Sequence, residues 1–405
     1  MNPSTRPNGF FIIILGLLSM LPPLAIDMYL PSFLDIAKDL SVSQEKVQTT
    51  LAIFTFGFAI GQLFWGPIAD SFGRKPIILL GLSGGAVASF FLTQVITIEN
   101  FYLWRLVQGL FGAAPAVVLG ALVRDLFERN QFARMMSTIM IITMVAPLLA
   151  PIAGGYIAKW FHWHTIFHLL MIMGILCVIL VSIRIPETLK PENRLPLNFG
   201  KVLNSFTQLI SHKATLGYVL VGGLSFAGMF SFLTSGSLVY IGLYGVSSEH
   251  FGYFFMLNII VMTIMTFVNG RLVMKIGSEN MLRIGLSLQL LAGIWLAVSA
   301  IFQLGLWSMA LGVALFVGMG PTVGSNASAA ILDRYPQMAG TANAVAGTAR
   351  FGIGSIIGAG LSHIPLATER PMLFTMALCS IGSVACYYFL SYHRQEPETE
   401  EIPQK

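Results

Sequence analysis

The sequence predicts an all-α membrane protein of twelve transmembrane helices arranged as two six-helix halves. Of its 405 residues, 55% are hydrophobic and only 10% are charged, whereas a soluble globular domain carries about 25% charged residues. The apolar residues also occur in long uninterrupted stretches, and about 20 apolar residues match a hydrocarbon layer ~30 Å thick. The lipid bilayer, rather than water, is therefore the expected surrounding of this chain.

Twelve apolar stretches, each bounded by charged or turn-forming residues, follow one another along the chain. The first six are predicted at 10–34, 47–69, 76–97, 100–127, 132–158 and 164–185. After a polar stretch rich in Pro, Asn, Lys and Glu, six more are predicted at 215–244, 250–273, 279–303, 305–332, 338–363 and 371–392. We therefore divide the chain into an N-terminal half (1–185), a cytoplasmic linker (186–214), a C-terminal half (215–392) and a cytoplasmic tail (393–405).

The distribution of basic residues predicts the orientation, because Lys and Arg near helix ends favour the cytoplasmic side. If both termini are cytoplasmic, only four of the 23 Lys and Arg residues fall in outer loops: Lys38, Lys46, Lys159 and Arg370. Two others, Arg105 and Arg350, lie within spans. We expect both termini and the linker to face the cytoplasm.

Several classes of protein are excluded by what the sequence lacks. The basic residues are dispersed between apolar stretches and form no surface for nucleic acid. The sequence contains no phosphate-binding P-loop, so ATP is not the expected energy source. No cluster of histidines or carboxylates near one surface suggests an enzyme. We expect no cofactor, and an ion gradient as the source of energy.

Three charged residues lie inside predicted spans: Asp27, Arg105 and Arg350. A charge within a bilayer costs ~2.5 to 3.5 kcal/mol, so each requires a reason. Asp27 and Arg105 are both predicted to lie ~10 Å below the outer surface, where an ion pair would reduce the cost of burial. A buried carboxyl also holds a proton more readily. We interpret Asp27 as a proton carrier with Arg105 as its partner, or as half of a static ion pair, and Arg350 as a candidate substrate contact.

The segment GPIADSFGRK at 66–75 is the most distinctive string in the chain. Its glycines permit a tight turn, and its acidic and basic side chains lie where a cytoplasmic helix end is expected. A salt bridge there would stabilise one conformation, although a charged turn that obeys the positive-inside rule explains the same residues. The candidate residues of this conformational latch are Gly66, Asp70, Gly73, Arg74 and Lys75.

The same segment resembles the signature between helices 2 and 3 of the major facilitator superfamily, with Ile68 in place of Leu. Arg105, Gln108, Gly109 and Gly112 resemble the family's helix 4 signature, whose arginine is implicated in proton coupling. The resemblance implies a major-facilitator-type fold of two six-helix halves that alternately expose a central cavity.

The segment APIAGG at 150–155 resembles the antiporter signature of helix 5, which is associated with exporters. It departs from the fuller pattern at Ala146 and Ala150, where the family prefers glycine. The candidate gate residues are Pro147, Pro151, Gly154 and Gly155; each proline can bend the helix. The strings at 27–31, 61–70 and 124–125 further resemble the Bcr/CflA branch, the bicyclomycin- and chloramphenicol-type exporters.

Polar or aromatic side chains within spans are candidates for the substrate cavity, although several of them are expected to bond between helices. These candidates are Tyr29, Gln62, Gln108, Asn258, Asn326, Asn343 and Arg350. A further polar group, His162, His164 and His168, lies among Trp and Phe residues at an outer helix end. Such rings favour the membrane interface, so we expect no metal site.

The resemblance implies a proton-coupled exporter of small amphipathic drugs, working by alternating access in a bacterial inner membrane. Its expected partners are a drug substrate, protons and the lipid bilayer, and the chain is expected to be a monomer. The alternative is a proton-linked importer of a small nutrient, because the 66–75 signature occurs in importers as well.

Overall fold

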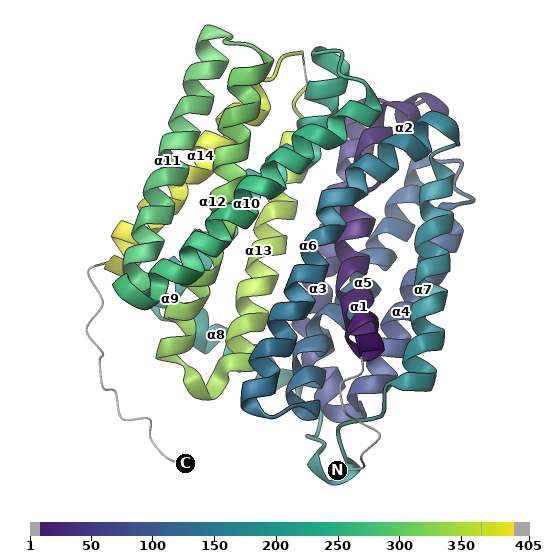
Figure 1. The fold of residues 1–405 in the computed structure, drawn as a ribbon, viewed down its shortest axis with the longest axis vertical. Helices are drawn as coiled ribbons and strands as arrows, with labels where there is room; N and C mark the ends of the chain where they lie inside the picture. Colours follow the sequence, from purple (N-terminus) through teal and green to yellow (C-terminus); the bar gives the residue numbers. More distant parts are fainter. Residues whose placement is uncertain (1–8, 366, 393–405) are drawn as a thin grey trace.

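The apolar stretches of the sequence form long helices that run side by side (Figure 1). The computed structural model describes residues 9–365 and 367–392, so the predicted tail lies outside the described residues. Within these ranges, twelve helical segments are long and apolar enough to cross a membrane. The predicted all-α membrane fold is therefore confirmed.

The first group of helices forms the part of the bundle drawn in purple and blue in Figure 1. Its members are α1 (Gly9–Asp27), α2 (Phe33–Asp39), α3 (Gln44–Phe72), α4 (Arg74–Leu92), α5 (Ile98–Leu126), α6 (Arg129–Trp160) and α7 (His164–Arg184).

The second group forms the part drawn in green and yellow. Its long helices are α9 (Lys213–Ser237), α10 (Ser248–Ile276), α11 (Ser278–Phe302), α12 (Leu306–Arg334), α13 (Ala339–Leu361) and α14 (Arg370–Cys386). Two of them continue as a turn of π-helix, η4 (Leu238–Leu243) after α9 and η6 (Tyr387–Ser391) after α14.

The first span is not the continuous helix predicted for 10–34, because α1 ends at Asp27. Pro31 lacks an N–H and its ring collides with the carbonyl four residues earlier, which is that of Asp27. The chain passes through a 3₁₀ turn, η2 (Leu30–Ser32), and resumes as α2. Asp27 consequently lies at a helix end rather than in mid-helix.

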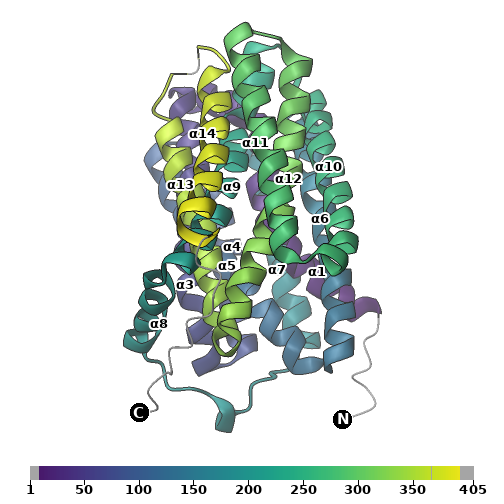
Figure 2. The ribbon, with the colours of Figure 1, turned by 90° about the vertical axis from the view of Figure 1, so that its left-hand side faces the viewer.

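The predicted linker contains a helix that its polar composition did not indicate, α8 (Phe199–Ser211). Figure 2 shows α8 at the side of the bundle, following the segment 185–198 that crosses the lower end of the molecule. Leu209 is fully buried and Phe206 is partly buried against residues of α9 and α13. The three-residue spacing of these two side chains places them on one face of a helix.

The two groups of helices meet along α3 with α13 and along α6 with α10. Within the first group, α5 approaches α3 so closely at Gly109 that a Cβ there would collide with the backbone carbonyl of Phe54. Gly112, one turn away on the same helix, has no atom within 4 Å of an added Cβ. Gly109 and Gly112 therefore differ sharply in the space around them.

Gly109→Ala is expected to destabilise the folded protein by about 1 to 3 kcal/mol, because the added methyl group must push α5 away from α3. Thermal unfolding of the purified protein in detergent measures the effect. Gly112→Ala is the matched control and should unfold at the parental temperature. Equal unfolding temperatures for the two variants would contradict this account of the α3–α5 contact.

Candidate functional site

A cavity of about 380 Å³ lies between the two groups of helices. Aromatic side chains form much of its wall: Phe58 from α3, Phe226 and Phe232 from α9, Phe255 from α10 and Phe351 from α13. Only a few polar side chains join them, among them Ser19, Asp27, Gln62 and Asn258. A cavity of this size, apolar with a few polar groups, is typical of a site for a small organic molecule.

Asp27 lies in the wall of this cavity and is 4% exposed. The break after α1 places it there, since the helix ends at this residue. No salt bridge in the described part of the chain includes Asp27. The end of α1 also carries the negative pole of the helix dipole, so burial and helix position both disfavour a negative charge here.

Arg105 is fully buried in α5 and, within the described chain, does not form the expected ion pair with Asp27. Its guanidinium carbon lies 4.3 Å from the ring centres of both Tyr29 and Phe54. Its Nη1 donates hydrogen bonds to the carbonyl oxygen of Ala25 at 3.1 Å and to Oε1 of Gln108 at 2.6 Å. Aromatic faces and two uncharged acceptors thus stabilise this cation.

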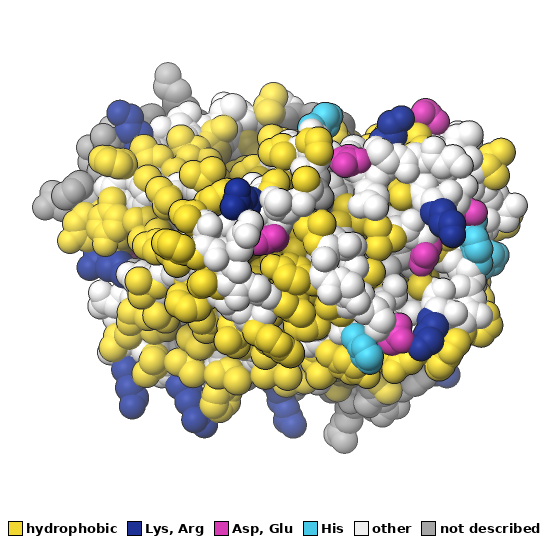
Figure 3. Space-filling model, turned by 90° about the horizontal axis from the view of Figure 1, so that it is seen from above, with side chains coloured by type: hydrophobic (Ala, Val, Ile, Leu, Met, Phe, Trp, Pro, Cys, Tyr) yellow, Lys and Arg dark blue, Asp and Glu magenta, His cyan; other side chains and the backbone are white. Residues whose placement is uncertain are grey.

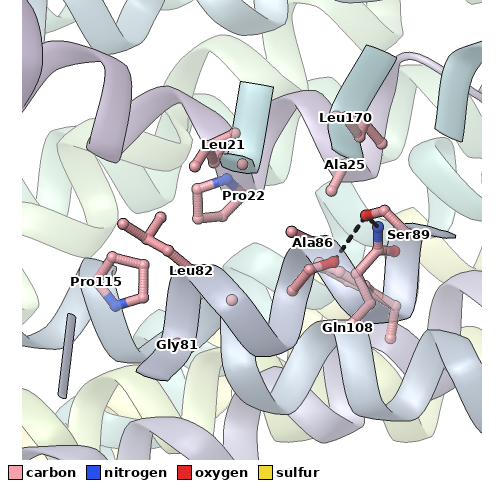
Figure 4. A pocket seen from close by; sticks show the side chains of 14 residues that line it. Leu21, Pro22, Ala25, Gly81, Leu82, Ala86, Ser89, Gln108, Pro115 and Leu170 are labelled. Carbon is pink, nitrogen blue, oxygen red and sulfur yellow. Dashed lines mark hydrogen bonds between the residues drawn. The ribbon is translucent and has the colours of Figure 1, made fainter. Parts of the chain in front are cut away.

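Gln108 extends this network to Ser89 of α4 (Figure 4). Its Nε2 donates to Oγ of Ser89 at 2.8 Å, which joins α5 to α4. Both side chains line a second cavity, of about 50 Å³, inside the first group of helices. This space is large enough for a few water molecules beside the Arg105 network.

The candidate cavity residues fall into three sets: those that line the central cavity, those that surround Arg105, and those that lie elsewhere. Gln62 and Asn258 line the central cavity, and Nδ2 of Asn258 has no hydrogen-bond partner among the described residues. Tyr29 and Gln108 do not line this cavity, because both are buried around Arg105.

The remaining candidates lie outside the set of residues that line this cavity. Asn326 donates to Oδ1 of Asn269 at 2.7 Å, which joins α12 to α10. Asn343 is exposed. Arg350 approaches α12 at Gly324, where a Cβ would lie 3.5 Å from the guanidinium Nη2. The aromatic wall was missed by the sequence reasoning, because phenylalanines in apolar stretches give no signal that separates a cavity wall from a lipid-facing surface.

The residues of the predicted antiporter signature lie where α6 meets two other helices. A Cβ on Gly154 would collide with the carbonyl of Met28, just after the break in α1, and one on Gly155 would collide with the carbonyl of Ser248 at the start of α10. Pro147 lines the central cavity, and Pro151 lies one turn further along α6. These small residues allow α6 to contact both the Asp27 region and the second half of the chain.

Further contacts between the halves lie near the same end of the bundle, opposite the 66–75 turn. Nζ of Lys159 in α6 lies 2.6 Å from Oε1 of Glu249 in α10. The hydroxyls of Thr49 in α3 and Ser362 after α13 are 2.9 Å apart. Gln48 of α3 donates to Oγ of Ser235 in α9 at 3.4 Å. We call this end of the molecule the Lys159 end.

The charged residues of the 66–75 turn form an ion cluster at the other end of the bundle. The Arg74 guanidinium contacts Asp70 at 2.5 Å and Asp125, near the end of α5, at 3.4 Å. Nζ of Lys75 donates to the carbonyl oxygen of Ser182 in α7 at 2.8 Å. This end of the molecule, the Arg74 end, therefore ties α3, α4, α5 and α7 together.

Glu187 is a member of this cluster that the sequence analysis missed. Its carboxylate accepts hydrogen bonds from the backbone N–H groups of Arg74, at 3.0 Å, and Lys75, at 3.2 Å. These are free donors at the start of α4, where a negative charge is favourable. Gly73 has a φ of 110°, and a Cβ there would meet Oε2 of Glu187 at 2.5 Å. The sequence analysis missed Glu187 because it lies 112 residues or more from the residues that it contacts.

Comparison with known proteins places the whole chain among membrane transporters. The family model described as the Major Facilitator Superfamily matches residues 15–359. A "Bicyclomycin resistance protein homolog" of Haemophilus influenzae is 54% identical over 95% of this chain and 97% of its own length. "Multidrug resistance protein D" of Escherichia coli strain K12 is 27% identical over 94% of this chain and 95% of its own length.

Solved structures show the same fold at low sequence identity. A D-xylose-proton symporter superposes with a TM-score of 0.75, at 14% identity, over 96% of this chain and 98% of its own. A mutant form of the nucleoside transporter NupG superposes with a TM-score of 0.72, at 13% identity, over 93% of this chain and 97% of its own. These likenesses confirm the arrangement of the helices.

Glu187→Ala is expected to loosen the segment after α7, because two N–H groups at the start of α4 lose a charged acceptor worth about 1 kcal/mol. Limited proteolysis of the purified protein should cut between 186 and 198 several times faster. Glu192→Ala is the matched control, since the Glu192 side chain is 72% exposed and its one ion pair among the described residues is with the exposed Lys190, at 3.7 Å. Equal cleavage rates in the two variants would show that Glu187 does not hold this segment.

Proposed function

Because this chain belongs to the Major Facilitator Superfamily, we propose that it exports small amphipathic drugs from the cytoplasm in exchange for protons. The observation that carries the proposal is the central cavity, which combines an aromatic wall with the carboxyl of Asp27. The names of the relatives, bicyclomycin resistance and multidrug resistance, support a drug as the substrate. The aromatic side chains would bind apolar surfaces of such a molecule, and Asn258 would offer a hydrogen bond.

Asp27 is the proposed site of the coupling proton. A carboxyl held in a mostly apolar wall at a helix end is favoured in its neutral form until water or a bound molecule changes its surroundings. Proton and drug would therefore compete for one cavity, which is the requirement for exchange. Arg105 would act on this site through Tyr29, the side chain that it stacks upon and that follows Asp27 by two residues.

Alternating access requires contacts that hold each end of the cavity closed in turn. The contacts at the Lys159 end join the two halves in this conformation. With the predicted orientation, in which both termini face the cytoplasm, the Lys159 end is the outer one. We infer that this conformation is closed to the outside, and that the ion pair of Lys159 with Glu249 must break when the drug leaves.

The remaining features of the proposal follow from the same orientation. The chain would lie in the inner membrane of a bacterium as a multi-pass monomer, with the Arg74 end in the cytoplasm. Its energy source would be the proton gradient, with no bound cofactor. The Asp70, Arg74 and Asp125 cluster would stabilise one conformation over the other.

Asp27→Asn is expected to abolish pH-gradient-driven accumulation of bicyclomycin in proteoliposomes, because the amide keeps the shape of the side chain but cannot bind and release a proton. Binding of the drug, measured by equilibrium dialysis, should remain within a few-fold of the parental affinity. Asp35→Asn is the matched control, since Asp35 is an exposed carboxylate on α2, and it should transport at the parental rate.

The direction of transport separates export from the import of a nutrient. In a bacterial host that lacks its own drug exporters, the parental chain should raise the inhibitory concentration of bicyclomycin several-fold, and Asp27→Asn should not. Uphill transport by Asp27→Asn at the parental rate would show that the proton travels elsewhere. Unchanged drug sensitivity, despite verified membrane insertion, would favour the importer.

A further inference from the structure

Three metal-binding side chains meet at the Lys159 end, within the first group of helices. They are Asp39, the last residue of α2, with His162 from the turn between α6 and α7 and His164, the first residue of α7. One ligand atom from each lies within 4.8 Å of the others, with Asp39 and His162 exposed and His164 half-buried. Figure 3 shows this end face, on which histidine, acidic and basic side chains gather toward the right.

A hydrogen bond fixes which nitrogen of the His164 ring carries the hydrogen. Nε2 of His164 lies 3.4 Å from the carbonyl oxygen of Val95. A carbonyl oxygen only accepts hydrogen bonds, so Nε2 is the N–H donor of this ring and its Nδ1 holds a lone pair. Nε2 of His162 lies 3.6 Å from Oδ2 of Asp39, a distance within the range of an ion pair but too long for a hydrogen bond.

The Nδ1 atoms of His162 and His164 are 2.6 Å apart. At this distance either one nitrogen donates a hydrogen bond to the other, or a metal ion bound by both takes the place of that hydrogen. A histidine that binds a metal through one nitrogen usually donates its other N–H to a carbonyl or carboxylate. His164 already has this arrangement, with the carbonyl of Val95 as its acceptor.

Trp163, which lies between the two histidines in the sequence, contacts both Asp39 and His164. Trp163 is 2% exposed, and its Nε1 donates to Oδ2 of Asp39 at 3.1 Å. Its ring stacks on that of His164 with the centres 3.6 Å apart. One side chain thus orients both the carboxylate of Asp39 and the imidazole of His164.

We propose that Asp39, His162 and His164 form a binding site for one divalent transition metal of the zinc class. Zinc binds nitrogen and oxygen at ~2.0 to 2.2 Å, which places tetrahedral ligands about 3.4 Å apart. The three side chains would have to rotate to reach this spacing, and a water molecule would complete the four ligands. Two imidazoles favour zinc, copper or nickel over magnesium or calcium.

The site joins the end of α2 to the α6–α7 turn, close to an ion pair that the proposed transport cycle uses. Lys159, which forms the ion pair with Glu249 of the other half, lies three residues before His162. A bound metal would restrain the turn that carries this ion pair. The sequence did not predict the site because Asp39 is more than a hundred residues from the histidines and completes the group only in the folded chain.

The test is zinc binding by the full-length protein, purified in detergent with an affinity tag that contains no histidine. Competition against a fluorescent zinc chelator should give one Zn²⁺ per chain, and excess Mg²⁺ should not compete. His162→Gln with His164→Gln, and separately Asp39→Asn, should each weaken binding at least ~10-fold, because each removes a ligand. Thermal unfolding of each variant confirms that it is folded.

Two exposed histidines outside the group provide the matched control. His168→Gln with His363→Gln removes as many imidazoles as the double ligand variant and should leave zinc affinity unchanged. The proposal is overturned if the ligand variants bind zinc as tightly as the parental chain, or if the parental chain shows no saturable binding. Because zinc binding is measured without transport, its outcome does not depend on whether the proposed drug export is correct.

Discussion

The cost of placing charge inside a bilayer is the constraint on which the arrangement of this protein depends. Each interior charge costs ~2.5 to 3.5 kcal/mol unless something in the fold offsets it. Arg105 is stabilised by two aromatic faces, a carbonyl and an amide oxygen. Asp27 forms no ion pair in the described chain and lies in the wall of the central cavity. A carboxyl without an ion partner is suited to gain and lose a proton rather than to stabilise the fold.

The same part of the structure connects the proposed proton site to the contacts between the halves. Pro31 ends α1 at Asp27, and the carbonyl of Met28 in the resulting turn lies against Gly154 of α6. The next residue of α6, Gly155, lies against the start of α10, and one turn later Lys159 forms its ion pair with Glu249. A single helix therefore contacts both the turn after Asp27 and the interface of the two halves. The small residues of the antiporter signature are explained by these two close approaches.

The twelve spans were predictable from sequence because the bilayer demands long apolar helices, and their ends are marked by charges and turn residues. The family signatures also located the ion pair of Asp70 and Arg74, which are four residues apart in sequence. Besides the break in the first span and the helix α8 in the linker, the predictions that failed concerned side chains brought together by folding. Arg105 was paired with Asp27 on depth alone, whereas the structure surrounds it with Tyr29 and Phe54. Glu187 and the phenylalanine wall were missed because neither contact distance nor cavity shape is encoded in a local pattern.

The central claim is that drug and proton compete at the Asp27 carboxyl. The most direct measurement is proton release when bicyclomycin binds to the purified protein in detergent, followed with a pH-indicator dye in a weakly buffered solution. The account predicts that saturating drug releases close to one proton per chain at acidic pH, and that this release disappears in Asp27→Asn although the drug still binds. Drug binding without proton release, or the same release from Asp27→Asn, would contradict it.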